Sequence, residues 1–197
     1  ALSFRLGNRL LGNEENAAGL EFTLNGPTLK FNQATRIALT GADMQATLDG
    51  NPVPGYTAIA IQPGQTLKLG KVVGEGARAY LAIAGGIQCT PYLGSRSTFT
   101  LGQFGGHGGR ALRTGDVLHF SPDNGAVSDL VVPETLKPSL GKQWTLRVIY
   151  GPHGAPDFFT DDDMAMFFST DWQVHYNSSR TGVRLVGPKP GWARSDG

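Results

Sequence analysis

The stretch Arg78-Ala79-Tyr80-Leu81-Ala82-Ile83-Ala84-Gly85-Gly86 decides which fold class we predict for this chain. Residues 78–84 form a mostly apolar run, which is typical of a buried strand, and the glycine pair ends it. Shorter runs precede and follow it, with apolar residues at every second position and turn residues between the runs. Many short strands at this spacing indicate an antiparallel barrel or sandwich, so we predict a mainly β protein.

The alternation of apolar and polar residues places further strands along the chain. We predict them at residues 20–24, 29–31, 37–40, 45–48, 57–61, 66–69, 117–120, 145–149, 171–176 and 183–186. The sequence Asp49-Gly50-Asn51-Pro52 is a strong hairpin signal between two of them. The last two strands are expected to form a hairpin, with Trp172, Val174 and Tyr176 on one face of its first strand.

Two short helices are also predicted. Residues 1–11 place Leu2, Leu6 and Leu10 on one face, and Gly12-Asn13 provides a stop. The polar residues of this helix are expected to face solvent, namely Arg5, Asn8 and Arg9.

The second helix is predicted from Thr160 to about Phe168. Thr160 and Asp163 have the spacing of a capping box, and the acidic residues 161–163 suit the positive end of a helix. Capping explains these carboxylates better than a metal site does. We expect the apolar side chains to face inward, namely Met164, Phe167 and Phe168.

Bulk composition narrows the function classes. The 197 residues fit one large or two small domains, and the polar stretch 122–142 reads as a linker between two units. A net charge of +1 argues against nucleic acid and membrane partners. The single cysteine, Cys89, excludes a disulfide within the chain and favours a cytoplasmic protein, in which we interpret it as a structural thiol. No apolar run approaches membrane-spanning length.

A polar and cationic segment at residues 175–185 is the first candidate site. The turn Asn177-Ser178-Ser179 would present an amide, and Arg180 and Arg184 would present guanidinium groups. An amide and fixed cations bind a small polar molecule and stabilise negative charge that develops on it. The structural alternative is a hairpin that carries solvated arginines.

A glycine-rich stretch at residues 94–110 is the second candidate. Glycines and hydroxyl side chains at this density let the backbone approach a ligand closely, although a flexible crossover in a barrel would have the same composition. No helix start with a Lys-Ser/Thr pair follows, so we predict no nucleotide loop. His107 has no partners at ligand spacing, and we predict no metal site.

Several segments resemble the KipA-like family, also called allophanate hydrolase subunit 2-like. In the first half they are Arg78 to Ile87, Leu93-Gly94-Ser95-Arg96-Ser97-Thr98, Gly105-Gly106 and Leu112-Arg113-Thr114-Gly115-Asp116. In the second half, segments resemble the carboxyltransferase region of urea carboxylase and urea amidolyase. They are Tyr150 to Phe159, Trp172, His175 to Ser178, Arg180 to Arg184, Gly187 to Pro190 and Trp192 to Gly197.

A related branch, the 5-oxoprolinase C subunits, usually has Asp and Met at the positions of Ser179 and Thr181. It also lacks the extension Trp192-Ala193-Arg194. The resemblance therefore favours the urea carboxylase branch.

The resemblance implies cyclophilin-like β-barrel domains with a few short helices. Residues 1–140 would be the first barrel unit, without its N-terminal part, and residues 143–197 would begin an incomplete second unit. The implied reaction is carboxyl transfer from N-carboxybiotin to urea, which gives allophanate. Biotin would sit on a carboxyl carrier domain outside this chain, and a biotin carboxylase domain of the parent would use ATP and Mg. Further partners would be urea and the KipI-like half of the carboxyltransferase, and the fragment alone would be inactive.

The resemblance also suggests roles for individual residues. The residues expected to contact urea, or to act in the transfer, are Asn177 (hydrogen bonds to urea), Arg180 and Arg184 (cations for the developing charge), Tyr176 (donor or wall), His153 (hydrogen bond or proton shuttle), and Asp157 and Asp196 (orienting arginines or accepting urea N–H). The residues expected to contact biotin are Ser95, Arg96 and Gln103. Structural alternatives stay open: Asp157 could simply begin a turn, Tyr176 could be core, and Arg184 could pair on a strand surface.

Two other functions compete with this interpretation. One is a protein like the 5-oxoprolinase C subunits, which acts on a lactam amide with ATP supplied elsewhere. The other is a non-catalytic KipA-like protein that binds and regulates a kinase inhibitor.

Overall fold

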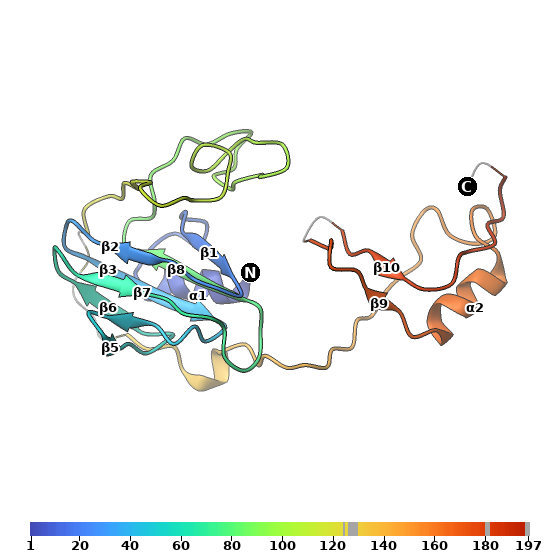
Figure 1. Cartoon of the computed structure of the whole chain (residues 1–197), viewed down its shortest axis with the longest axis horizontal. Coiled ribbons are helices and arrows are strands. Elements are labelled where there is room, and N and C mark those ends of the chain that lie inside the picture. The colour runs from blue at the N-terminus through green and yellow to red at the C-terminus, as the bar shows by residue number, and fades with distance from the viewer. Residues whose placement is uncertain (124, 126–129, 180–181, 196–197) are drawn as a thin grey trace. The chain divides into compact units, whose positions relative to one another are not determined.

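The computed structural model describes residues 1–123, 125, 130–179 and 182–195 (Figure 1). The chain divides into two compact units, Ala1–Trp144 and Thr145–Gly197, and each is described here by itself. Within the described residues, no helix is long and apolar enough to cross a membrane. The sequence-based expectation that both units are partial β-barrels stays a prediction.

The first unit contains two four-stranded antiparallel sheets (Figure 1). The first sheet has the order β1 (Leu20–Thr23), β8 (Arg78–Ile83), β3 (Thr35–Gly41) and β6 (Ala58–Ile61). The second has the order β2 (Thr28–Lys30), β7 (Thr66–Lys68), β4 (Thr47–Leu48) and β5 (Asn51–Pro52). The mainly β prediction is confirmed, and the Asp49–Gly50 hairpin joins β4 to β5 as expected.

Strand β8 lies inside the first sheet, and its register explains its apolar sequence. Leu81 is opposite Leu20 of β1 and Leu39 of β3, and it is fully buried. Leu81 faces a core that also holds Leu67 of the second sheet, whereas Ala82 faces a separate cluster with Leu10 of the first helix. Both faces of the strand are therefore covered, which is why its sequence is apolar almost throughout instead of alternating.

Helix α1 (Leu2–Leu10) packs on β3 and β8, and it corrects one expectation. Asn8, predicted to face solvent, has no exposed surface. Its amide donates to the carbonyls of Ala17 (3.0 Å) and Glu15 (3.3 Å), and its Oδ1 accepts from the Asn13 amide (3.1 Å). Asn8 is buried because these partners replace water, which periodicity cannot reveal. Arg5 and Arg9 are exposed, as expected.

Two further predictions for the first unit are wrong. Residues 117–120 form no strand, because only an isolated bridge joins Phe120 to Ile87, although Leu118 and Phe120 do pack against the core. The stretch 122–142 is not simply a linker: the Val132 N–H donates to the Tyr56 carbonyl (3.0 Å), and Val132 is buried. The same stretch contains the short helix η1 (Glu134–Leu136).

The second unit contains helix α2 (Asp161–Ser169) and the two-stranded sheet of β9 (Gln173–Val174) and β10 (Leu185–Val186). The capping box of Thr160 and Asp163 is confirmed, and so is the returning hairpin, although its strands are shorter than predicted. The prediction that Phe167 and Phe168 face inward is wrong, since they are 42% and 61% exposed. Met164 is half-buried.

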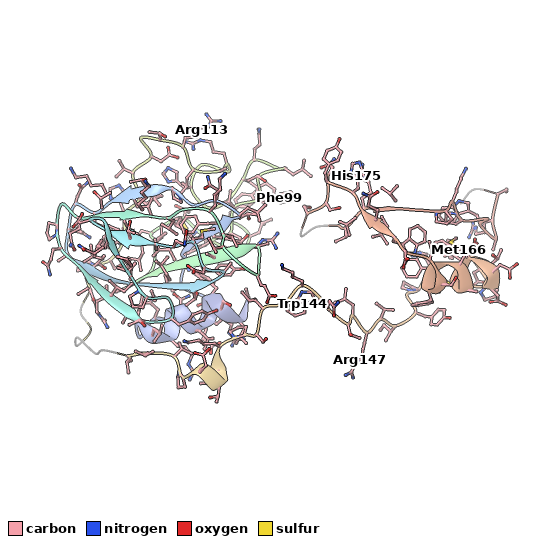
Figure 2. All side chains as sticks on the ribbon, turned by 60° about the horizontal axis from the view of Figure 1, so that its bottom comes forward. Phe99, Arg113, Trp144, Arg147, Met166 and His175 are labelled. Carbon is pink, nitrogen blue, oxygen red and sulfur yellow. The ribbon has the colours of Figure 1, made fainter. Side chains whose placement is uncertain are left out.

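The predicted strand at residues 145–149 is also absent. The segment is extended, but no described strand pairs with it, and Figure 2 shows Trp144 and Arg147 with their side chains standing off the ribbon. Its apolar side chains are exposed, among them Leu146 at 82% and Ile149 at 94%. The alternation is present in the sequence, but a strand forms only beside a partner.

An ion pair joins Arg36 of β3 to Asp123, which lies in the loop after residue 120. Arg36 Nε donates to Asp123 Oδ2 (2.6 Å) and Nη2 donates to Oδ1 (2.9 Å), and the two side chains are 7% and 15% exposed. The hydrogen bonds from Arg36 hold the pKa of Asp123 below its ordinary value.

This pair should make stability depend on pH. Asp123→Asn removes the charge, and we expect it to lower the free energy of unfolding at pH 7 by about 2 kcal/mol, between the values for exposed and fully buried pairs. Because the folded pKa of Asp123 is depressed, its contribution is complete above about pH 4 and is lost as the pH falls through the folded value. Guanidinium chloride unfolding from pH 7 to pH 2 measures the difference. Glu75→Gln, at an exposed carboxylate, is the control, and a difference that does not shrink in acid would contradict the assignment.

Candidate functional site

The hairpin of the second unit is organised by the hydroxyl of Ser178. Its Oγ donates to the His175 carbonyl (2.7 Å) and accepts from the Arg184 N–H (3.0 Å). The His175 N–H donates to the Arg184 carbonyl (2.8 Å), and the Asn177 N–H donates to His175 Nδ1 (3.1 Å). A short side chain therefore closes the turn and fixes the backbone on which Asn177 stands.

The predicted substrate-contacting residues of this hairpin lie at its surface. Asn177 and Arg184 are exposed, and Tyr176 is 94% exposed, with its ring centroid 4.2 Å from that of His175. The alternative of Tyr176 as a core residue is therefore wrong. Arg180 and Asp196 lie outside the described residues.

A second group forms around the ring of Phe158. The His153 ring meets it edge-on with centroids 4.6 Å apart, and the Arg194 guanidinium lies over it at 5.0 Å from the centroid. The backbone joins the same two segments, since the Ala193 N–H donates to the Phe158 carbonyl (3.0 Å). Asp157, the residue before Phe158, is exposed. The group unites His153, which was predicted as a site residue, with Arg194, for which no role in the site was predicted.

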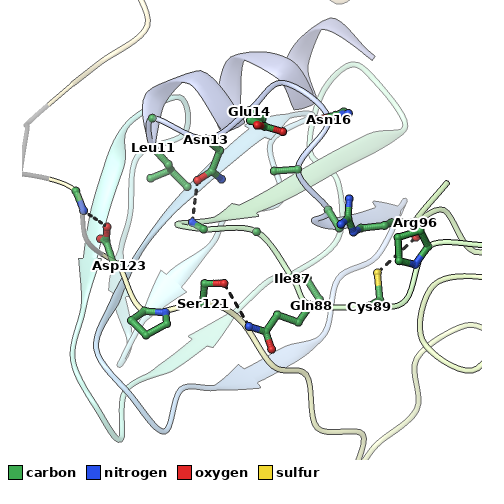
Figure 3. Close-up of a pocket in the computed structure, with 18 of the residues that line it drawn as sticks. Leu11, Asn13, Glu14, Asn16, Ile87, Gln88, Cys89, Arg96, Ser121 and Asp123 are labelled. Carbon is green, nitrogen blue, oxygen red and sulfur yellow. Dashed lines mark hydrogen bonds between the residues drawn. The ribbon is translucent and has the colours of Figure 1, made fainter. Parts of the chain in front are cut away.

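In the first unit, a pocket of about 910 Å³ lies between the loops that follow α1 and β8 (Figure 3). The Gly85 N–H donates to Asn13 Oδ1 (2.8 Å) at one wall, and the Gln88 amide donates to Ser121 Oγ (3.3 Å) at another. Arg96 lines the pocket, with its carbonyl 3.8 Å from the Cys89 sulfur. Of the residues predicted to contact biotin, Arg96 alone is among those that line it.

The other two predicted biotin contacts lie in the loop outside this lining. Ser95 Oγ accepts a hydrogen bond from the Ser97 N–H (3.1 Å). Gln103 has φ = +57°, and a Cβ atom added to Gly109 would overlap its carbonyl. The loop is thus folded tightly on itself at glycines, which is a different structure from a flexible crossover.

An ion pair closes the same loop. Arg110 makes two hydrogen bonds to Asp116, at 2.7 and 2.8 Å, and the Arg113 N–H donates to it at 2.7 Å. The hydrogen bonds from Arg110 hold the pKa of Asp116 well below its ordinary value. His107 Nε2 lies 3.8 Å from this carboxylate. Among the residues that the structure describes, no three or more His, Cys, Asp or Glu side chains lie close enough together to hold a metal ion.

The polar groups fall into separate sets, and each can do different chemistry. The hairpin presents an amide and a guanidinium on a braced turn, and the Phe158 group presents an imidazole and a guanidinium on one ring. Arg96 presents a cation beside the pocket of the first unit. Each set suits hydrogen bonding and stabilisation of negative charge on a small polar molecule.

Comparison with known proteins identifies the chain. It matches the family described as carboxyltransferase domain, subdomain A and B, over residues 1–197. Urea amidolyase from Saccharomyces cerevisiae is 48% identical over 203 residues, which cover 100% of this chain and 11% of that protein. The C subunit of 5-oxoprolinase from Escherichia coli is 36% identical, with 94% of this chain and 57% of that protein covered.

Solved structures give the same result. The crystal structure of the Kluyveromyces lactis urea carboxylase matches with a TM-score of 0.86 and 44% identity, and covers 98% of this chain and 18% of that one. The chain therefore spans a small part of the length of the curated urea-degrading relatives.

The bracing of the hairpin by Ser178 can be tested directly. Ser178→Ala removes hydrogen bonds on both sides of the turn, and we expect residues 175–184 to exchange their amide hydrogens faster, with about 1 kcal/mol less local stability. Hydrogen exchange followed by mass spectrometry measures this. Ser169→Ala is the matched control, because that hydroxyl makes one long bond to the Met166 carbonyl (3.4 Å) within α2. Unchanged exchange in Ser178→Ala would show that the turn is held by other contacts.

Proposed function

This chain belongs to the carboxyltransferase domain family, and on that premise we propose that it is part of a biotin-dependent urea carboxylase. Its reaction would transfer the carboxyl group of N-carboxybiotin to urea and form allophanate. The observation that carries the proposal is the 48% identity to urea amidolyase along the whole chain. The braced hairpin and the Phe158 group support it, because each offers donors for a small amide and for anionic oxygens.

The chemistry needs positioning and charge stabilisation more than a protein nucleophile. Carboxybiotin, when bound, supplies the carboxyl group as CO2 and a ureido nitrogen that takes up a proton from urea. Asn177 would orient urea, since its amide both accepts and donates hydrogen bonds. Arg184, together with Arg180, would stabilise negative charge on the oxygens, and His153 would hydrogen-bond the substrate or pass a proton.

The pocket of the first unit fits the polar head of biotin in its chemistry. Gln88 and Thr90 line it with groups that can hydrogen-bond a ureido ring, and Arg96 adds a cation for its oxygen. We assign Arg96 as the strongest biotin contact of the three predicted ones. Ser95 would then shape the loop that carries Arg96, because its Oγ accepts a hydrogen bond from the Ser97 N–H.

The rest of the enzyme would lie outside this chain, which corresponds to 11% of the yeast urea amidolyase. A biotin carboxylase with ATP and Mg, a biotin carrier and a KipI-like half of the carboxyltransferase are the partners we propose. Residues 1–140 and 143–197 would then belong to two barrel units of this half of the carboxyltransferase.

A component of a 5-oxoprolinase is the second candidate, favoured by 36% identity to the corresponding Escherichia coli protein. The residues Ser179 and Thr181 and the extension Trp192-Ala193-Arg194 depart from the pattern of that branch. Stimulation by 5-oxoproline would identify it.

The test is ATP cleavage by the full-length, biotinylated protein in bicarbonate, with urea, 5-oxoproline or neither. We expect stimulation by urea, and we expect Asn177→Ala and Arg180→Ala each to reduce it on the order of 100-fold, because a preorganised donor is lost. Asn51→Ala, on exposed strand β5, is the control and should retain full stimulation. Stimulation by 5-oxoproline alone, or by neither compound, would overturn the proposal.

A further inference from the structure

The carboxylate of Asp163 does more than cap helix α2. It accepts hydrogen bonds from the Thr160 N–H (2.9 Å), the Gly191 N–H (2.7 Å) and the Trp192 N–H (3.2 Å), and so uses both of its oxygens. The residue is 7% exposed. The bond from Thr160 completes the capping box. The bonds from Gly191 and Trp192 are not part of the capping box, and they attach a segment that is distant in sequence to the start of α2.

The neighbouring carboxylates differ from Asp163 in their surroundings. Asp161 and Asp162 share the first turn of α2 but are exposed, so the helix end already has its complement of negative charge. The pKa of Asp163 is held below its ordinary value, and the Gly191 N–H is the largest cause, ahead of the Thr160 N–H. The N–H groups of residues 191 and 192 therefore act on this carboxylate in addition to the capping box of its own helix.

The segment held by Asp163 has an unusual backbone. Trp192 has φ = +57°, a left-handed conformation that bulky side chains rarely adopt. Such a conformation persists when the surroundings fix it, and it is often found at functional sites. Here the Asp163 carboxylate fixes the Trp192 N–H, and the Trp192 ring packs on Phe159 with centroids 4.8 Å apart.

This anchored backbone leads directly to Arg194, two residues after Trp192. The Ala193 N–H bonds to the Phe158 carbonyl, and the Arg194 guanidinium then lies over the Phe158 ring, which His153 meets at its edge. The chain of contacts runs from Asp163 through Gly191 and Trp192 to Arg194 and His153.

We infer that Asp163 is a positioning residue for the carboxyl transfer, and that it holds Arg194 as a functional cation on the Phe158 ring that His153 also contacts. The inference rests on the proposed function. A guanidinium fixed on an aromatic ring that an imidazole also contacts offers a preorganised charge to the anionic oxygens of the reaction. A small displacement of such a group lowers the rate strongly.

Two substitutions separate capping from positioning. Asp163→Glu keeps a capping-box residue at the third position of the helix, because Glu is favoured there, but moves the carboxylate by one methylene. Asp163→Asn removes the charge and one accepting oxygen. Asp161→Asn is the matched control on the same helical turn.

The first readout is independent of the reaction. We expect hydrogen exchange at residues 191–193 to accelerate in both Asp163 variants, on the order of 10-fold, with α2 still protected in Asp163→Glu and no change in Asp161→Asn. Unchanged exchange at residues 191–193 in Asp163→Glu would overturn the tether, whatever the enzyme catalyses.

The second readout is urea-stimulated ATP cleavage by the full-length, biotinylated protein. We expect kcat to fall on the order of 10-fold in Asp163→Glu, in which α2 remains protected from exchange, and to stay at the wild-type value in Asp161→Asn. Wild-type kcat in a variant whose tether is loosened would overturn the positioning role. Absence of urea stimulation in the wild-type protein would instead count against the proposed function, and the exchange result would still decide the tether.

Discussion

The first unit depends on one strand that is covered on every side. Strand β8 pairs with β1 and β3 along its edges, faces the second sheet through Leu81 and faces α1 through Ala82. Burial of such side chains contributes about 2 kcal/mol each, and the ladders satisfy the backbone groups that burial would otherwise leave without partners. Strand β8 also positions one loop that lines the pocket, because this loop follows the strand directly at Gly85.

Hydrogen bonds from polar side chains hold the loops that the hydrophobic core does not contact. The Asn13 amide donates to the Ile83 carbonyl (2.8 Å), and its oxygen accepts from the Gly85 N–H, so the end of α1 is bonded to the end of β8. Ser178 and Asp163 act in the same way in the second unit, where many of the described apolar side chains are exposed. Short polar side chains with several backbone partners therefore give definition to the loops where function is proposed.

The sequence correctly predicted those structural features that depend on short sequence patterns. The turn at Asp49–Gly50 and the capping box at Thr160 appear in the structure because each depends on residues close together in the chain. The apolar run at 78–84 was also predicted correctly, because a continuous apolar run indicates a strand that is covered on both faces. The missed features depend on distant partners. Asn8 is buried by carbonyls that the helix pattern does not include, and residues 145–149 have the alternation of a strand without a described strand beside them.

The candidate site likewise has residues that were predicted from the sequence and a contact that only the structure reveals. Residue type pointed to Asn177, and the family resemblance pointed to His153 and Arg96. The contact of Arg194 with Phe158 arises from tertiary geometry alone. That contact makes the Phe158 ring a shared support for two charged or ionisable groups. Substitutions at His153 and Arg194 are therefore thermodynamically coupled through the ring, and their effects should not add. In evolution, a change at Phe158 would alter both neighbours at once, so these three positions are expected to vary together.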